Sequence, residues 1–279
     1  MIFFACALSF LLCFVLVPAV GALSWKIGAV DVPRDWRRMH RQSIPRGGGI
    51  AIFAAFFVAC MLLGEWSRGV ACALAGGLLI LLVGLADDIF CLSPLAKLFF
   101  QASVATAAVL GSRLTAEWGI PLGILWVVTL TNAHNFIDGM DGLFAGCAAI
   151  EGGVLFAALA LTGRLEMEFA PLLLCGSCLG FFCFNRYPAR IFAGDCGSGA
   201  VGFLLGMLSL ELFDVPRLDF AMLTPFLIFA YPLTDLLTAV LRRTLRGKNP
   251  FAADRGHLHH RLSAVGLAQP QCVRVLHAM

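Results

Sequence analysis

Long runs of apolar residues, separated by short polar segments, occupy most of the chain. Many of the runs approach the ~20 residues that a helix needs to cross the hydrocarbon core of a membrane. The pattern therefore predicts an all-α, polytopic bundle of about nine transmembrane helices, with approximate boundaries where a run is short. The predicted spans are residues 2–24, 48–64, 69–86, 95–111, 119–131, 143–161, 169–184, 199–213 and 219–241.

The composition agrees with a single integral membrane domain over residues 1–279. Hydrophobic residues make up 60% of the chain and charged residues only 13%, whereas a soluble domain is about half apolar and a quarter charged. The first segment has no basic region and no small-residue cleavage site, so we expect a retained helix and not a signal peptide. Most of the 11 cysteines lie in apolar runs, which is typical of small buried side chains.

The distribution of positive charge predicts the orientation of the bundle. The connections between spans fall alternately on two sides, and one side holds four of the 20 lysines and arginines: Arg68, Arg113, Arg164 and Arg217. The other sixteen, and all six histidines, fall on the opposite side. Because cytoplasmic loops are rich in Lys and Arg, we expect the N-terminus outside, the C-terminus inside, and the chemically active loops on the cytoplasmic face.

The most polar stretch, Asn132–Leu143, reads N-A-H-N-F-I-D-G-M-D-G-L and lies between two apolar runs. Such residues are tolerated at a helix end that faces water, but not in the middle of a membrane. Carboxylate and amide oxygens suit a hard cation or sugar and base hydroxyls, and a glycine after each aspartate lets the backbone approach a ligand. The alternative is a helix–loop–helix whose turn is simply polar.

Two further segments carry carboxylates. Asp87 and Asp88 close the third predicted span, where adjacent like charges repel unless a cation or a proton intervenes. Lys97 and Gln101 follow, one helical turn apart; the lysine could snorkel to the surface or hold a lipid phosphate. The segment G-D-C-G-S contains Asp195 and enters the eighth span.

A small-residue loop that enters a helix offers backbone N–H groups and a favourable dipole to an anion. An aspartate in such a loop is best explained by a metal ion that bridges it to a phosphate. The alternative is that Asp195 or Ser198 only caps the helix.

Two basic clusters complete the candidate chemistry. Residues 34–49 contain five arginines and end in the turn Pro45-Arg46 before three glycines. This cluster either binds anionic lipid or forms a shaped loop near a phosphate. The second cluster consists of His257, His259, His260 and Arg261. Neighbouring arginines disfavour a transition metal there, so we expect a clamp on a polyanionic substrate.

In this order, the motifs resemble the polyprenyl-phosphate N-acetylhexosamine-1-phosphate transferase family (glycosyltransferase family 4), in its undecaprenyl-phosphate GlcNAc-1-phosphate transferase-like branch. Members are integral membrane enzymes that move a sugar-1-phosphate from a UDP-sugar onto a lipid phosphate. The resemblance runs from about Asp31 to the end of the chain. It rests on Asp87-Asp88, Lys97 with Gln101, Asn132–Leu143, Gly194–Ser198 and His257–Arg261.

The resemblance implies a role for each matching residue. Asp195 and Asn135 are expected to bind Mg²⁺, with Mn²⁺ as an alternative, while Asp87 acts as base for the lipid phosphate. The implied catalytic residues are Asp87, Asp88, His257 and His259. The implied substrate-binding residues are Lys97, Asn132, Asp138, Asp141, Phe192, His260 and Arg261, with Asp138 and Phe192 on the uridine.

The implied reaction transfers N-acetylhexosamine-1-phosphate from a UDP-sugar, UDP-GlcNAc or a relative of it, to undecaprenyl phosphate with release of UMP. It would begin a cell-envelope glycan such as lipopolysaccharide at the bacterial inner membrane. The resemblance also permits a homodimer and gives no nucleic acid as a partner. Related chains continue beyond the histidine motif into further spans, so a final span is expected to be lacking after Met279.

The alternatives are a transporter or a lipid-binding protein without catalytic activity. A transporter concentrates ionisable groups near the membrane midplane, where this chain places only Glu151. We expect Glu151 to make a polar contact between helices. A lipid-binding scaffold would explain the basic loops but not the five aspartates of the motifs.

Overall fold

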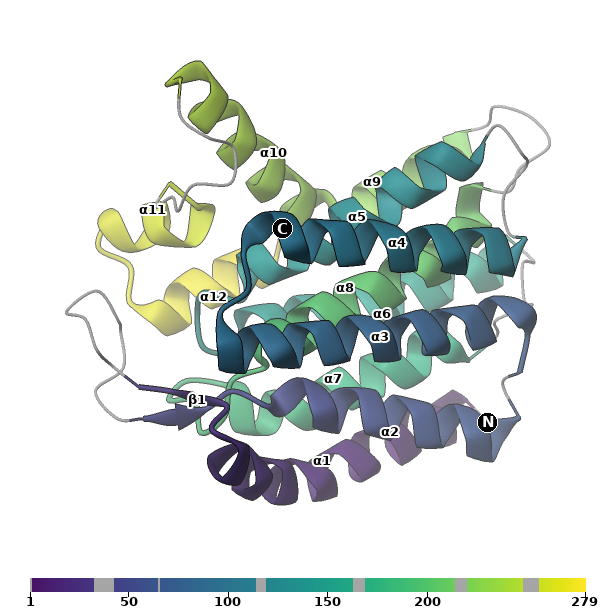
Figure 1. Ribbon diagram of the computed structural model, residues 1–279, viewed down its shortest axis with the longest axis horizontal. Helices are drawn as coiled ribbons and strands as arrows, with labels where there is room; N and C mark the ends of the chain where they lie inside the picture. The colour runs from purple at the N-terminus through teal and green to yellow at the C-terminus, as the bar shows by residue number, and fades with distance from the viewer. Residues whose placement is uncertain are drawn as a thin grey trace.

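The computed structural model describes residues 2–32, 43–64, 66–113, 119–162, 169–213, 220–247 and 256–279. Its helices confirm the predicted all-α class (Figure 1). The first eight are α1 (Ile2–Ile27), α2 (Gly48–Leu63), α3 (Arg68–Phe90), α4 (Pro94–Ser112), α5 (Ile120–Ile137), α6 (Leu143–Leu161), α7 (Ala170–Asn185) and α8 (Gly194–Ser209). The short 3₁₀ helices η2 (Leu210–Phe213) and η3 (Phe220–Leu223) precede α9 (Thr224–Ile228), α10 (Ala230–Leu245), α11 (Leu258–Ala264) and α12 (Gln269–His277). A two-stranded antiparallel ribbon pairs β1 (Val30–Asp31) with β2 (Ile44–Pro45).

A multi-pass membrane protein is confirmed by the length and apolarity of the helices. Within the described ranges, 6 helices are long and apolar enough to cross a membrane: α1, α3, α4, α5, α6 and α8 with η2. Helices α2 and α7 are also apolar but shorter, at 16 residues each. The count of about nine spans stays a prediction.

The predicted ninth span, 219–241, is not one continuous helix over its described part. Phe229 interrupts it with φ −99° and ψ 23°, so that α9 ends at Ile228 and α10 begins at Ala230. Pro232 explains the position of the break, because a proline lacks the N–H that would bond to residue i−4 and its ring clashes with that carbonyl. The carbonyl in question belongs to Ile228.

Helix ends also differ from the predicted spans at the two polar motifs. Helix α3 continues to Phe90, so Asp87 and Asp88 lie in its last turn and not in a loop. Helix α5 continues to Ile137 and carries Asn132 and Asn135 on its last turns. The apolar pattern alone predicts loops at these positions, because polar residues in the last turns of a helix interrupt an apolar run.

Helix α8 lies at the centre of the bundle, with α3, α5 and α2 packed around it (Figure 1). In the most apolar 18-residue stretch of α8–η2, 94% of the residues are buried, against 22% for α1. Glycines allow this close packing. A Cβ atom on Gly84 of α3 would lie 2.5 Å from Asp195 O, and one on Gly202 of α8 would lie 2.6 Å from Leu130 O. Small residues at such contacts let membrane helices approach backbone to backbone.

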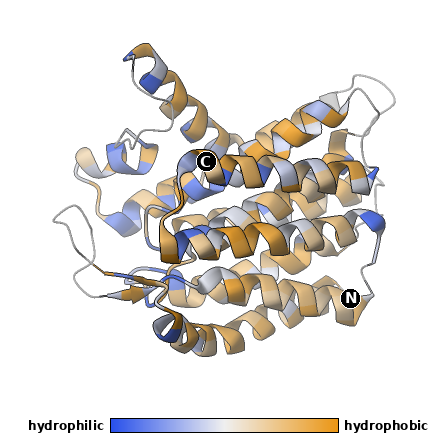
Figure 2. Ribbon diagram, in the orientation of Figure 1, coloured by the Kyte–Doolittle hydropathy of each residue, from blue (hydrophilic) through white to orange (hydrophobic). Residues whose placement is uncertain are grey.

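Hydrophilic residues gather at one end of the bundle, near the β-ribbon, α11 and α12 (Figure 2). The end of α3, the start of α4, the end of α5 and the start of α8 meet there. The C-terminal helix α12 folds back on α6, where Nε2 of His277 lies 3.2 Å from Leu143 O. The expectation that the polar motifs share one side is therefore confirmed for the described residues, whereas the side that faces the cytoplasm stays a prediction.

The contact between α2 and α8 predicts the effect of a single methyl group. A Cβ atom on Gly49 would collide with the backbone of Gly197, which cannot move as a flexible side chain would. We expect Gly49→Ala to lower the free energy of unfolding by about 1–3 kcal/mol, seen as a lower melting temperature in detergent. The matched control is Gly153→Ala, where the new atom would meet only Cys175 Sγ at 3.7 Å. An equal melting temperature for both variants would contradict this packing.

Candidate active site

An ammonium group shared by two carboxylates forms the centre of the polar end. Cys91, directly after α3, has a left-handed conformation (φ 55°), and Ser93 caps the start of α4 by accepting from Ala96 N. This short connection places Lys97, in the first turn of α4, over the last turn of α3. Lys97 Nζ donates to Asp87 Oδ2 at 2.8 Å and to Asp195 Oδ2 at 2.8 Å.

Asp88 has a different environment from its neighbour Asp87. Its side chain is fully buried, and its two oxygens accept from the backbone N–H groups of Asp195 at 3.0 Å and Cys196 at 3.1 Å. A carboxylate at this position satisfies the first-turn donors of α8 and interacts favourably with the helix dipole. The terminal guanidinium nitrogen of Arg46 lies 3.4 Å from Asp88 Oδ1 and 3.4 Å from Asp195 Oδ1.

The prediction that backbone N–H groups at the start of α8 bind an anionic ligand is therefore wrong for two of these groups, those of Asp195 and Cys196. The anion that they bind is the protein's own Asp88 carboxylate. The alternative of a local cap is wrong too, since Asp195 lies inside the helix and the Ser198 hydroxyl donates to Gly194 O at 3.0 Å. A catalytic role for Asp88 stays a prediction, and its contacts are those of a helix cap.

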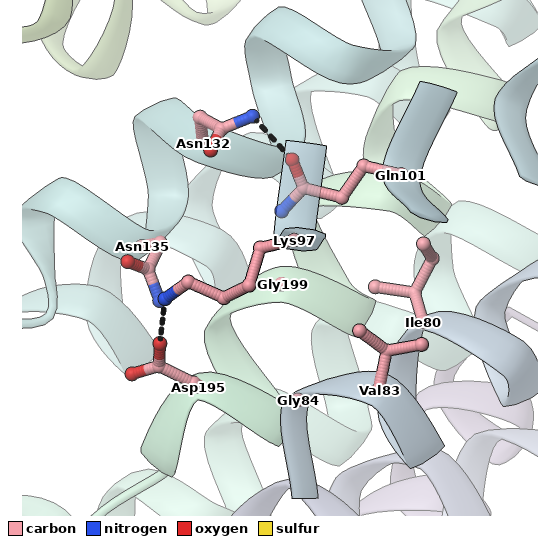
Figure 3. Close-up of a pocket in the computed structure, with 9 residues that line it drawn as sticks. All are labelled: Ile80, Val83, Gly84, Lys97, Gln101, Asn132, Asn135, Asp195 and Gly199. Atoms are coloured by element: carbon pink, nitrogen blue, oxygen red, sulfur yellow. Dashed lines mark hydrogen bonds and ion pairs between the residues drawn. The ribbon is translucent and has the colours of Figure 1, made fainter. Parts of the chain in front are cut away.

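A small, partly open pocket lies beside the Lys97–Asp195 pair (Figure 3). Asn132 donates to Gln101 Oε1 at 2.8 Å, and Asn135 donates to Ser198 Oγ at 3.0 Å. The lining is thus polar on the side of α4, α5 and α8 and apolar on the side of α3. The lining residues are Ile80, Val83, Gly84, Lys97, Gln101, Asn132, Asn135, Asp195 and Gly199.

The turn after α5 is held by two side chains. Asp141 Oδ2 accepts from Ala189 N at 2.9 Å. Asn185, at the end of α7, accepts from Gly142 N at 3.1 Å and donates to Ile191 O at 2.9 Å. These bonds join the turn to the segment that carries Phe192. A uridine ligand shared by Asp138 and Phe192 stays a prediction. A substrate contact for Asp141 stays a prediction, since its oxygen braces this loop.

Asp138 comes directly after the last residue of α5. Burial raises the pKa of Asp138 well above its usual range, although Arg46 nearby acts in the opposite direction. The carboxylates of Asp195 and Asp88 add to the increase in the pKa of Asp138. A carboxyl group of this kind can donate a hydrogen bond as well as accept one.

The histidine cluster lies directly against this turn. The His259 ring packs on Gly139, where a Cβ atom would come within 2.6 Å of Nε2. The His257 and His259 rings stack with their centroids 5.6 Å apart, and His260 follows at 4.3 Å from His259. Arg261 of α11 is exposed. Burial, with the neighbouring His260, lowers the pKa of His259 to about 4, so His259 is neutral near pH 7 in the unliganded chain.

Asp235 of α10 orients the cluster and was missed as a site residue. Its Oδ2 lies 2.7 Å from His257 Nδ1, and its Oδ1 accepts from Leu258 N at 2.7 Å. One carboxylate therefore caps α11 and fixes which ring nitrogen of His257 faces away. The available signal was that Asp235 is the one acidic residue between 220 and 241.

The buried Glu151 pairs with His134, another residue without a predicted role. Glu151 Oε2 lies 2.7 Å from His134 Nε2, and His134 Nδ1 lies 2.8 Å from Leu130 O. The predicted polar contact between helices is thus confirmed, and it joins α6 to α5 next to Asn135.

The comparison with known families agrees with this arrangement of motifs. The family model described as glycosyl transferase family 4 matches residues 70–213, just over half of the chain, from α3 to η2. The chain belongs to glycosyl transferase family 4. The predicted family is thereby confirmed, and the matched region holds Asp87, Lys97, Asn135 and Asp195.

Relatives cover nearly the whole chain. It is 35% identical to the probable undecaprenyl-phosphate N-acetylglucosaminyl 1-phosphate transferase of Bacillus subtilis, over 96% of this chain and 79% of that protein. It is 33% identical to the decaprenyl-phosphate N-acetylglucosaminephosphotransferase of Mycolicibacterium smegmatis, over 92% and 74%. A third relative, the undecaprenyl-phosphate alpha-N-acetylglucosaminyl 1-phosphate transferase of Yersinia pestis, is 32% identical over 88% and 72%.

The lowered pKa of His259 predicts a pH-dependent loss of stability. The pKa is about 4 in the folded chain against 6.5 for the free side chain, so protons bind the unfolded chain first as the pH falls. The stability contributed by neutral His259 is present above pH 6.5 and is lost as the pH falls towards about 4. As the pH falls from about 7 to about 5, the free energy of unfolding should decrease less for His259→Gln than for the unchanged protein, by on the order of 1 kcal/mol.

The measurement is the melting temperature of both proteins in detergent across this pH range. Readings at about pH 7 and pH 8 serve as the control, since neutral His259 dominates in both states there and the difference between the proteins should stay constant. Curves that remain parallel down to about pH 5 would show that His259 titrates normally.

Proposed function

We propose that this protein transfers N-acetylglucosamine-1-phosphate from UDP-GlcNAc to a polyprenyl phosphate and releases UMP. The observation that carries the proposal is the Lys97 ammonium held between Asp87 and Asp195 beside a pocket with one apolar wall. The relatives named for this transfer match the chain over most of its length. The reaction would start a cell-envelope glycan.

The pocket suits the acceptor lipid. Ile80 and Val83 form its apolar side, whereas Lys97, Gln101 and Asn132 form its polar side. A phosphate joined to an apolar chain needs both surfaces, and an ammonium group binds phosphate as a compact charge. Asp87 would orient the acceptor phosphate through Lys97, and little proton removal is required because a phosphate monoester is already largely ionised near neutral pH.

The turn after α5 suits the donor. Asp138 can accept from and donate to uracil or ribose groups, and Phe192 lies in the segment that Asn185 joins to this turn. His257 and His259 lie on the other side of Gly139, within reach of a sugar or diphosphate bound there. His259 would act as a neutral hydrogen-bonding group, because burial holds its pKa at about 4.

The residues present fit a magnesium ion. Asp195, Asp87 and the Asn135 amide supply hard oxygen donors near one another. In the described ranges, no three His, Cys, Asp or Glu side chains form a metal cage. Mg²⁺ commonly binds through one or two carboxylates, waters and substrate phosphates, and Mn²⁺ accepts similar ligands. When bound, the ion would neutralise the diphosphate and align it for displacement.

The chain's own residues would align the displacement. An oxygen of the acceptor phosphate forms a bond to the sugar-linked phosphorus, and the bond from that phosphorus to the bridging oxygen breaks, so UMP leaves. Arg46 and Lys97 offset the negative charge that gathers at this point. The turn after α5 and the histidine cluster would hold the donor in place.

Purified protein should release UMP from UDP-GlcNAc only when polyprenyl phosphate and a divalent cation are present. Asp195→Asn should lower the rate on the order of a hundredfold or more, because one charge is lost from a site built for a cation. Its melting temperature should stay close to that of the unchanged protein, since Asp88 bonds to the backbone of residue 195 and not to its side chain. UMP release without acceptor, or full activity of the variant, would contradict the proposal.

We infer a cytoplasmic active site in a bacterial inner membrane from the excess of Lys and Arg on the polar side. The test uses a variant without native cysteines and an impermeant thiol reagent on intact cells. Exposed positions Ser93 and Val265, at the polar end, should resist labelling as cysteines. Thr162, exposed after α6 at the other end, should be labelled. Labelling of both Ser93→Cys and Val265→Cys would reverse the orientation.

A further inference from the structure

Lys97 makes the same contact to two aspartates on different helices. Its Nζ lies 2.8 Å from Asp87 Oδ2 of α3 and 2.8 Å from Asp195 Oδ2 of α8. The two carboxyl groups are close enough to interact with each other. An ammonium group at this point therefore separates two negative charges that would otherwise repel.

Both oxygens of Asp195 are already matched by positive charge. Lys97 is next to Oδ2, and Arg46 lies 3.4 Å from Oδ1. Arg46 also forms an ion pair with the buried Asp88, which caps α8. Asp88 cannot move away without leaving two backbone N–H groups of α8 unbonded. Among the residues that the structure describes, Lys97 forms ion pairs with Asp87 and Asp195 but not with Asp88, and its side chain is 26% exposed.

A divalent cation at Asp195 would meet the Lys97 ammonium at close range. Like charges at such distances repel strongly at the edge of a protein, so the two cations cannot share Asp195 Oδ2. Lys97 has an open direction in which to move, because the pocket continues past it towards Gln101 and Asn132 (Figure 3). A lysine has four rotatable side-chain bonds and a compact charge, which suit such a displacement.

We propose that Lys97 is a resident counter-ion of Asp195 that a divalent cation displaces into the pocket, where the ammonium group binds the acceptor phosphate. The second half of this statement rests on the proposed function, whereas the first half concerns cation binding alone. Cation loading and acceptor binding are then coupled through one side chain. The cation gains a carboxylate, and the phosphate gains an ammonium group.

The test is a titration of purified protein in detergent with Mn²⁺ alone, followed by the electron paramagnetic resonance signal of the free ion. Lys97→Gln removes the competing charge, so Mn²⁺ should bind on the order of tenfold more tightly than to the unchanged protein. Lys97→Met is a second variant of similar length, and melting temperatures confirm that both fold. Lys26→Gln changes an exposed lysine at the end of α1 and should leave Mn²⁺ affinity and UMP release unchanged.

An equal or weaker affinity for Mn²⁺ in folded Lys97→Gln and Lys97→Met overturns the inference, and so does the lack of saturable binding in every protein. Asp195→Asn should abolish the gain when combined with Lys97→Gln. UMP release on the same preparations separates the two proposals. Release by the unchanged protein with no gain in affinity leaves the function standing without the counter-ion, whereas a gain without release from UDP-GlcNAc supports the counter-ion and contradicts the function.

Discussion

The bond between the Asp88 carboxylate and the first turn of α8 is the interaction on which the polar end depends. A helix N-terminus leaves backbone N–H groups without partners, and α8 starts inside the bundle, where water cannot serve all of them. A carboxylate from α3 accepts from two of these groups, and Arg46 balances its charge. The close approach at Gly84 makes this bond possible, because any larger residue would separate α3 from α8.

The same bond determines the geometry of the chemistry. Asp195 donates its backbone N–H to Asp88, so its side chain is held at a fixed distance from α3 and from the first turn of α4. Lys97 then reaches both Asp87 and Asp195 from a helix that only three residues separate from α3. Adjacent aspartates in the sequence thus have separate contacts. Asp88 accepts from the backbone of α8, whereas Asp87 bonds to Lys97, which lines the pocket.

The sequence was sufficient for the fold class, the family and the grouping of the motifs, because apolar runs and motif order are local properties. It was not sufficient for helix ends at polar residues: Asp87 and Asn135 lie on helices, where their side chains bond to Lys97 and Ser198 of neighbouring helices. The break before α10 was predictable from Pro232, but only if proline had been weighed against apolarity. Pairings such as Asp235 with His257 depend on how helices pack, and no spacing in one chain reveals them.

The pair of His134 and Glu151 has a consequence for the electrical properties of the bundle. Leu130 O can only accept, so His134 Nδ1 must carry a hydrogen, and a single further hydrogen lies between Nε2 and the carboxyl group. Whichever partner holds that hydrogen, the pair as a whole carries no net charge. Two ionisable residues thus lie among the spans with no net charge for the membrane voltage to act on. A hydrogen that moves between His134 Nε2 and Glu151 Oε2 travels less than the 2.7 Å that separates these two atoms.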